Sequence, residues 1–245
     1  EGSDKWYWKT VKASDSGIVK EEELQAAKQQ MTEEQFEQEY ECSFTASIIG
    51  AYYGKLIAEA EDDNRVTKVP YDPSLPVHTA WDLGINDATA IWFAQVYRGG
   101  AIHIIDYYEN SGVGLDHYAE VLNRKDFVFG DHLAPHDIEV RELGSGKSRL
   151  ETALSLGIRF KVVPKIKVAD GINATRMLLP KCFFDRDKTQ DGVDMLRQYR
   201  QEWDDRKKVF RDHPRHDYTS HAADAFRYLA TGLEQRTRMV RPPQT

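Results

Sequence analysis

The sequence predicts an α/β protein, a mixed β-sheet flanked by helices with a helical segment in front of it, and three observations lead there. Apolar, β-prone runs follow one another at residues 77–84, 88–98 and 101–109. The turn signature Arg98-Gly99-Gly100 separates the last two, so they form a hairpin. Beyond them helical and strand-like segments alternate, a pattern that produces parallel crossovers. Hairpin and crossover connections together indicate a mixed sheet.

Length and composition set the limits of this prediction. The 245 residues are 40% hydrophobic and 11% aromatic, enough for one large domain and an appendage. No run approaches the roughly 18 apolar residues of a membrane span. Cys42 and Cys182 form no CxxC pair, which fits a reducing cytoplasm. The first residues lack both the apolar core of a signal peptide and an initiating Met, which suggests a fragment or a renumbered chain.

The N-terminal quarter is helical in character. Residues 21–30 form one expected helix and residues 31–40 a second, with Thr32 as its N-cap. Residues 61–76 contain three prolines and many polar side chains, and we expect a linker there. The expected domains are a helical segment, a linker, the sheet domain and a flexible basic tail, at 1–60, 61–76, 77–232 and 233–245.

Beyond the hairpin, two further strands are expected, at 126–134 and 158–164. Helices are expected between and after them. Their approximate ranges are 115–124, 148–157, 168–179, 190–202 and 219–232. The helix at 148–157 ends in Gly157, a favourable C-terminal residue.

Charge is unevenly distributed along the chain. The net charge is −7, yet residues 1–140 carry 26 acids against 11 bases, and residues 141–245 carry 22 bases against 14 acids. A nucleic-acid surface needs a local positive field rather than a basic protein, so the second half could supply one. Ordinary solvated faces explain the same charge pattern.

Three aspartates stand at the ends of expected elements. Asp82 ends the first strand, before Gly84, and carboxyl ends of strands are where α/β folds place reacting groups. Asp137 follows the fourth strand, with Asp131 as the competing choice. Asp224 lies on the last helix, three residues after His221 and therefore on the same face. Asp87, across the turn from Asp82, is interpreted as a loop-shaping residue.

These acids suit hard divalent cations. Mg²⁺ and Mn²⁺ prefer oxygen ligands, and two ions about 3.5–4 Å apart activate water and stabilise the leaving oxygen in phosphodiester cleavage. Such a site needs carboxylates that converge from dispersed positions. His132 and His136 flank the Asp137 region without an HExxH motif, and we interpret them as structural or weakly supporting.

A glycine-rich stretch, GSGKS at 144–148, is only superficially a phosphate loop. The first glycine of the complete motif would fall at Arg141. We interpret the stretch as a flexible loop whose neighbouring bases form a candidate track for DNA phosphates. The predicted DNA-binding residues are Arg141, Lys147, Arg149, Lys165 and Lys167.

The order of these motifs carries a family resemblance. WDLGINDATA, LAPHDIE, GSGKSRLETALSLGI and SHAADAFRY resemble, in this succession, the nuclease domain of tailed-phage terminase large subunits over residues 77–232. SDSGIVKEEEL, MTEEQFEQEYECSF and GAYYGKL resemble the segment that joins the terminase ATPase to that nuclease. The specificity lies in the order and spacing rather than in any single motif.

The resemblance implies a ribonuclease H-like fold and metal-dependent cleavage of double-stranded DNA concatemers during genome packaging. It makes Asp82, Asp137 and Asp224 the metal-binding catalytic acids, with His221 as a further candidate ligand, and Mg²⁺ or Mn²⁺, two ions, as cofactor. The implied partners are double-stranded DNA, the small terminase subunit and the portal or procapsid, in the host cytoplasm. The ATPase motifs are absent from this chain, so no ATP hydrolysis is expected.

Two other readings remain open. A junction resolvase or integrase would share the fold and prefer branched DNA. A catalytically idle module would bind DNA, the portal or the small subunit without using the acid cluster, and metal binding would distinguish it.

Overall fold

A computed structural model describes residues 13–30, 49–84, 87–141, 146–204 and 206–240. The helix predicted at 31–40 and the last residues of the predicted tail, 241–245, lie outside them. At the N-terminal end, α1 (Ala13–Ser16) precedes α2 (Glu21–Gln30), so the helix predicted at 21–30 is confirmed. Three glutamates in the first turn of α2 suit the positive end of the helix dipole.

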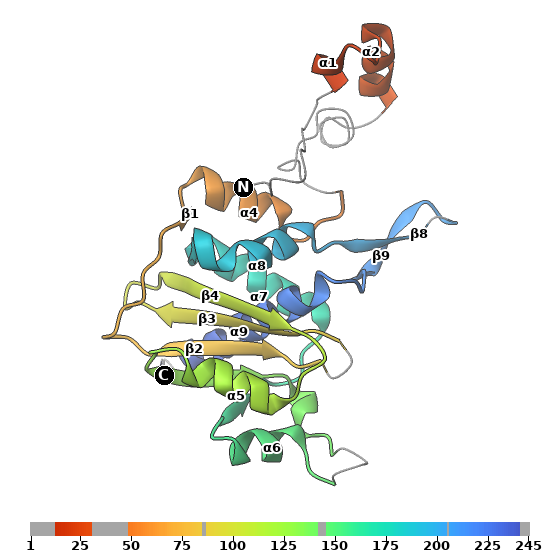
Figure 1. The fold of residues 1–245 in the computed structure, drawn as a ribbon. Helices are drawn as coiled ribbons and strands as arrows, with labels where there is room; N and C mark the ends of the chain where they lie inside the picture. The colour runs from red at the N-terminus through yellow and green to blue at the C-terminus, as the bar shows by residue number, and fades with distance from the viewer. Residues whose placement is uncertain (1–12, 31–48, 85–86, 142–145, 205, 241–245) are drawn as a thin grey trace, which may run out of the picture.

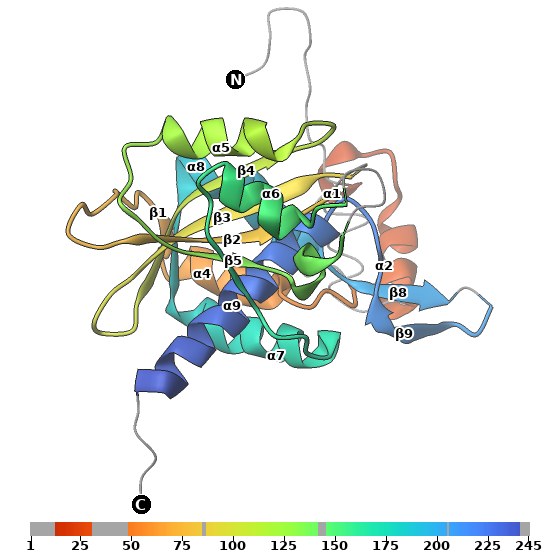
Figure 2. The same cartoon turned by 90° about the horizontal axis from the view of Figure 1, so that it is seen from below.

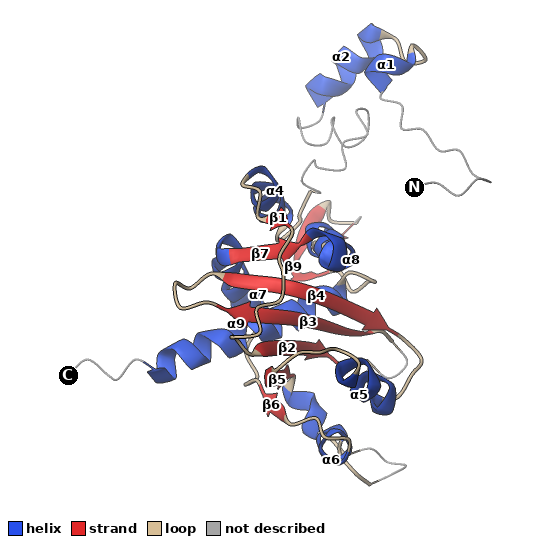
Figure 3. Ribbon diagram, turned by 60° about the vertical axis from the view of Figure 1, so that its left-hand side comes forward, coloured by secondary structure: helices blue, strands red, loops and turns tan. Residues whose placement is uncertain are grey.

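A seven-stranded sheet runs through the molecule in the order β1-β7-β4-β3-β2-β5-β6 (Figures 1 and 3). Its strands are β1 (Val66–Thr67), β2 (Val77–Asp82), β3 (Thr89–Val96), β4 (Ile102–Asn110), β5 (Phe129–Ala134), β6 (Phe160–Val162) and β7 (Cys182–Asp185). β3 pairs antiparallel with β2 and β4, and the other pairings are parallel. The predicted hairpins and the mixed sheet flanked by helices are confirmed.

Helices cover both faces of the sheet (Figure 2). One face packs against α9, with α7, α8 and α4 around it, and the other against α5 and α6. These helices are α4 (Gly54–Asp62), α5 (Leu115–Asn123), α6 (Arg149–Ser155), α7 (Val168–Leu178), α8 (Arg186–Gln198) and α9 (Ser220–Val240). Short 3₁₀ turns, η1 (His136–Glu139) and η2 (Leu179–Lys181), follow β5 and α7.

The two-residue period of the strands builds two separate cores. On β3, Trp92 faces the α9 side and Phe93 faces the α5 side, and both are fully buried. The indole N–H of Trp92 donates to the carbonyl of Ala222 at 2.8 Å, which fixes the first turn of α9 on the sheet. Because Ala222, Ala223 and Ala225 are small, α9 can approach the strands closely.

Several elements differ from the sequence prediction. The helix expected at 190–202 begins at Arg186, because Asp185 caps it by accepting from the Lys188 N–H at 3.1 Å. Strand β7 and the hairpin of β8 (Gln201–Asp204) and β9 (Val209–Pro214) were not predicted. The hairpin forms because the Asp204 carboxylate accepts from two consecutive turn N–H groups.

Two boundaries also differ. The helix expected to end at residue 232 continues to Val240, so residues 233–240 are helical rather than a flexible tail. The predicted linker at 61–76 contains β1, which extends the sheet beside β7. The division of the chain into domains stays a prediction. Among the described helices, none combines the length and apolar composition of a membrane span.

Candidate active site

The first candidate residue, Asp82, is the last residue of β2 and lies on the α9 side of the sheet. Ala80 belongs to the α9-side core, and the two-residue period puts Asp82 on the same face. The hydroxyl of Thr89, which donates to the Gly84 carbonyl at 3.2 Å, closes the turn that follows. The Asp82 side chain is 21% exposed. The Asp82 carboxylate is therefore partly exposed to solvent at the carboxyl end of β2.

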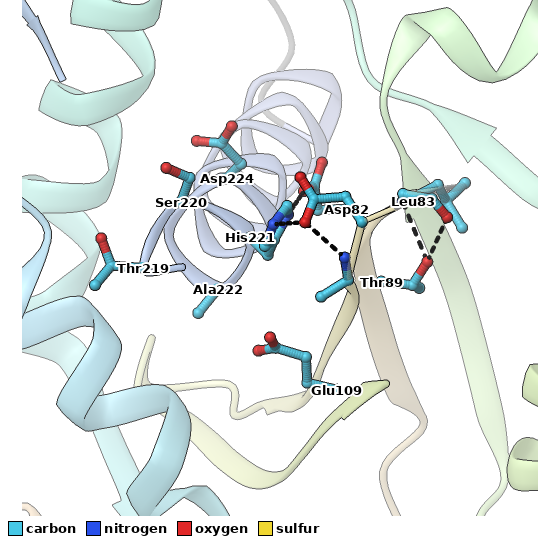
Figure 4. Close-up of polar contacts among 12 residues, drawn as sticks. Asp82, Leu83, Thr89, Glu109, Thr219, Ser220, His221, Ala222 and Asp224 are labelled. Carbon is cyan, nitrogen blue, oxygen red and sulfur yellow. Dashed lines mark hydrogen bonds and ion pairs between the residues drawn. The ribbon is translucent and has the colours of Figure 1, made fainter. Parts of the chain in front are cut away.

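His221 connects two carboxylates (Figure 4). Its Nδ1 lies 3.1 Å from Oδ2 of Asp82, and its Nε2 lies 2.8 Å from Oδ1 of Asp87. The hydrogen bond to Asp82, together with the charges of both aspartates, raises the pKa of His221 to about 9 against the effect of burial. At neutral pH His221 is therefore an imidazolium that donates from both ring nitrogens.

Asp87 does more than shape the loop, the role that the sequence indicated, because it also binds a side chain of the site. Its carboxylate accepts from the Ala88 N–H at 3.0 Å and also binds His221. The Ala88 N–H, more than His221, lowers the pKa of Asp87. The sequence signal was a second acid five residues after Asp82, across a tight turn.

Asp224 lies three residues after His221 on α9, on the same face. Its side chain is 28% exposed, and Oδ1 lies 3.1 Å from Nη2 of Arg227. Burial is the main cause that raises the pKa of Asp224 to about 6; Arg227 opposes the rise, and the charge of Asp82 adds to it. The charges of Asp82 and Asp224 are therefore close enough to repel each other.

Asp137 lies in η1, one turn past β5. Burial raises the pKa of Tyr228 to about 12, and the charges of Asp224, Asp82 and Asp137 contribute in that order. The three predicted acids thus lie within electrostatic reach of one hydroxyl. Asp131, the alternative, lies within β5 and pairs with Lys161 at 3.5 Å.

The donor chemistry fits a hard divalent cation. Asp82 and Asp224 offer oxygen donors, and their repulsion is what a cation between them would relieve. Within the described part of the chain, no three acid, imidazole or thiol groups are arranged to hold one ion. The structure joins His221 to Asp82 and puts Asp224 one helical turn further along α9, while Asp137 lies in η1.

Glu109 is an acid that the sequence reasoning missed. The cross-strand pairs Asp82–Ala90 and Ala90–Glu109 put Asp82 and Glu109 on one face of the sheet, two strands apart. Its carboxylate accepts from the Tyr107 hydroxyl, and it lines a cleft of about 420 Å³ together with Asp191. The available signal was an acid near the end of the third predicted strand.

Of the predicted DNA-binding residues, Arg141, Lys147 and Arg149 lie near the start of α6, and Lys165 and Lys167 precede α7. Arg149 donates from Nη1 to the Leu83 carbonyl at 2.9 Å, directly after Asp82, and borders a cleft of about 410 Å³. Arg141 donates to the Gly146 carbonyl at 3.1 Å and pairs with Glu151. Lys147, Lys165 and Lys167 are exposed. The start of α6 is fixed by a capping box, in which Ser148 and Glu151 bond reciprocally.

The contacts of His132 are those of a structural histidine, one of the two roles that the sequence left open. Its Nδ1 lies 2.7 Å from the Thr79 hydroxyl, and burial lowers its pKa to about 4. Trp81 and Phe160 lie edge-on to this ring.

No protein-family model and no curated protein sequence matches the chain significantly. Solved structures share its fold. The large terminase of a thermophilic bacteriophage superposes with a TM-score of 0.57 at 14% identity, over 91% of this chain and 55% of that one. The chain thus spans about half the length of that protein.

Two isolated nuclease domains are also similar. The P22 large terminase nuclease domain gives a TM-score of 0.51 at 16% identity, over 72% of this chain and 91% of that one. The nuclease domain of the SPP1 large terminase, with bound Mn, gives 0.50 at 17% identity, over 65% and 86%. This chain has the fold of large terminase nuclease domains, as the sequence resemblance indicated.

Proposed function

We propose that this chain is the nuclease part of a bacteriophage large terminase and cuts double-stranded DNA during genome packaging inside the host cell. The carrying observation is that His221 of α9 binds Asp82 at the carboxyl end of β2, one helical turn before Asp224, in a fold shared with terminase nucleases. The small terminase subunit and the portal or procapsid are the partners proposed with this function.

The proposed metal site uses Asp82 and Asp224 directly, with Asp137 joining once an ion is bound. Two Mg²⁺ or Mn²⁺ ions would supply an activated water and stabilise the leaving oxygen. The SPP1 nuclease domain was solved with Mn, which supports a divalent ion here. His221 orients Asp82 through Nδ1, and to become a ligand itself it must lose a proton and release one carboxylate.

In this proposal the basic side chains near α6 bind DNA rather than metal. Lys147 and Arg149 lie at the N-terminal end of α6 and would bind backbone phosphates. Because Arg149 also donates to the Leu83 carbonyl, a strand that it binds is brought next to Asp82. The carboxylates then act on a phosphodiester that basic residues have positioned.

The test is cleavage of a supercoiled plasmid with Mg²⁺, Mn²⁺ or EDTA. We expect cutting without sequence preference that stops in EDTA and in Asp82→Asn. Asp137→Asn should be as inactive, while Asp131→Asn, its matched control on β5, should cut normally. Undiminished cutting in EDTA would contradict the proposal, and a preference for four-way junctions would favour a resolvase.

One observation favours an idle docking module instead. The ion pairs of His221 with Asp82 and Asp87 already neutralise carboxylates that a metal needs. Calorimetry with Mn²⁺ separates the two functions, because an idle module would release no binding heat.

A further inference from the structure

Arg227 lies directly behind the candidate acid Asp224, one turn later on α9. The residue is only 8% exposed, and its Nη2 lies 3.1 Å from Oδ1 of Asp224. Its guanidinium carbon lies 5.7 Å from the centre of the Tyr228 ring. A cation is thus held almost entirely inside the protein, with its ion-pair partner at the edge of the site.

A glycine on α7 makes room for this side chain. A Cβ at Gly171 would lie 2.8 Å from both Cγ and Cδ of Arg227, closer than real side chains approach. Helices α7 and α9 pack against each other, so the arginine stem is confined between them. This confinement fixes where the guanidinium can point, and hence where Asp224 is held.

A second buried arginine shows what a purely structural pair looks like. Arg197 on α8 is also 8% exposed, and its Nη1 donates to Oε2 of Glu61 on α4 at 2.9 Å. That pair links two helices, whereas Arg227 and Asp224 belong to the same helix. The ion pair between Arg227 and Asp224 therefore joins no second helix to α9. Because burying a cation costs free energy, the stability of the fold alone gives little reason to bury Arg227.

The surroundings of Asp224 supply that reason. Oδ1 of its carboxylate pairs with the cation of Arg227, and one turn earlier on the same helix His221 binds Asp82. We propose that Arg227 is a positioning residue, which holds Oδ1 of Asp224 so that Oδ2 is presented to a divalent cation shared with Asp82. The inference rests on the proposed metal-dependent function and assigns Arg227 and Gly171 a part in it.

The test measures Mn²⁺ binding by calorimetry at pH 8, together with cleavage and thermal unfolding. Arg227→Met removes the charge and keeps the length of the side chain. We expect Mn²⁺ affinity to fall by about 10- to 100-fold, the usual effect of losing a partner of a metal ligand. Arg197→Met is the matched control, and it should unfold at a lower temperature yet bind Mn²⁺ like the parent protein.

Two further variants keep the test decisive if Arg227→Met does not fold. Arg227→Lys retains a cation and should recover part of the Mn²⁺ affinity. Gly171→Ala changes no charge but displaces the arginine, and should also weaken Mn²⁺ binding. Equal Mn²⁺ affinities in the parent, the Arg227 variants and Gly171→Ala would overturn the inference.

The parent protein reports separately on the proposed function. If it neither binds Mn²⁺ nor cuts DNA, the proposed function fails and the inference falls with it. If the parent protein binds and cuts while Arg227→Met and Arg197→Met behave alike, only the positioning role of Arg227 is wrong.

Discussion

Nδ1 of His221 lies 3.1 Å from Oδ2 of Asp82, and this contact joins the first turn of α9 to the end of β2. It brings together residues 139 positions apart in the sequence. Because the other ring nitrogen binds Asp87, His221 acts as an internal cation among acids.

Replacing Asp82 with Asn should abolish cleavage and leave the fold intact. The same change removes the negative charge from the group that most raises the pKa of His221, so that pKa should fall from about 9 toward 6.5. Titration of the His221 ring by NMR measures the shift. DNA binding should persist or tighten, because a negative charge near the phosphates is lost. Cutting at the parent rate by Asp82→Asn would refute the role of this acid.

His221 should make the protein less stable in alkaline solution. Its folded pKa of about 9 exceeds the unfolded value near 6.5, so folding takes up a proton between these values. The resulting stabilisation is complete below pH 6.5 and is lost as the pH rises through 9, by about 2 kcal/mol once solvent screening of the pair is allowed for. Urea unfolding from pH 6 to 10 should show this loss in the parent protein and a flatter profile in His221→Asn. An identical slope in both proteins would contradict it.

His132 should make the folded protein less stable in acidic solution, the opposite of the effect of His221. Burial lowers its folded pKa to about 4, below the unfolded value, so the unfolded chain binds the extra proton. Stability is therefore present above pH 6.5 and falls as the pH drops toward 4, by up to about 3 kcal/mol. The hydroxyl of Thr79 accepts from the Trp81 indole, which leaves its own proton for His132 Nδ1. His132→Gln should flatten the acid limb of the unfolding profile, and an acid limb unchanged from that of the parent protein would contradict this prediction.

The fold was largely predictable because its central strands are buried on both faces. Continuous apolar runs identified β2, β3 and β4, and the Gly-Gly turn fixed their hairpin. Strand β7 was missed because only four residues, Cys182–Asp185, separate η2 from α8. Strand β1 has two residues, and only its pairing with β7 makes it a strand. Segments this short do not show the two-residue alternation of apolar and polar side chains by which a strand is predicted from sequence.

The sequence predicted several individual residues of the site, but it did not predict how their side chains contact one another. Strand and helix ends singled out Asp82 and Asp224, and the i, i+3 spacing put His221 beside Asp224. To predict that Glu109 lies on the same face as Asp82, one must know the register of β4 against β3, which a sequence pattern does not give. The pairing of His221 with Asp87 required the path of the turn after β2.

DNA binding should depend on the N-terminal end of α6. We expect Lys147→Ala combined with Arg149→Ala to weaken duplex binding and to lower its salt slope by about one unit for each lost phosphate contact. Lys68→Ala is the control, because Lys68 follows β1 at the opposite edge of the sheet from β6. Fluorescence anisotropy with a labelled duplex at several salt concentrations gives both quantities.

The two α6 residues should also differ from each other. Both changes remove a charge that binds phosphate, and Arg149→Ala also removes the bond to the Leu83 carbonyl and so loosens the chain beside Asp82. Cleavage by Arg149→Ala should therefore stay slow even when saturating DNA restores full binding, while Lys147→Ala should recover. If both variants recover fully at saturating DNA, Arg149 binds phosphate without positioning the strand at the acids.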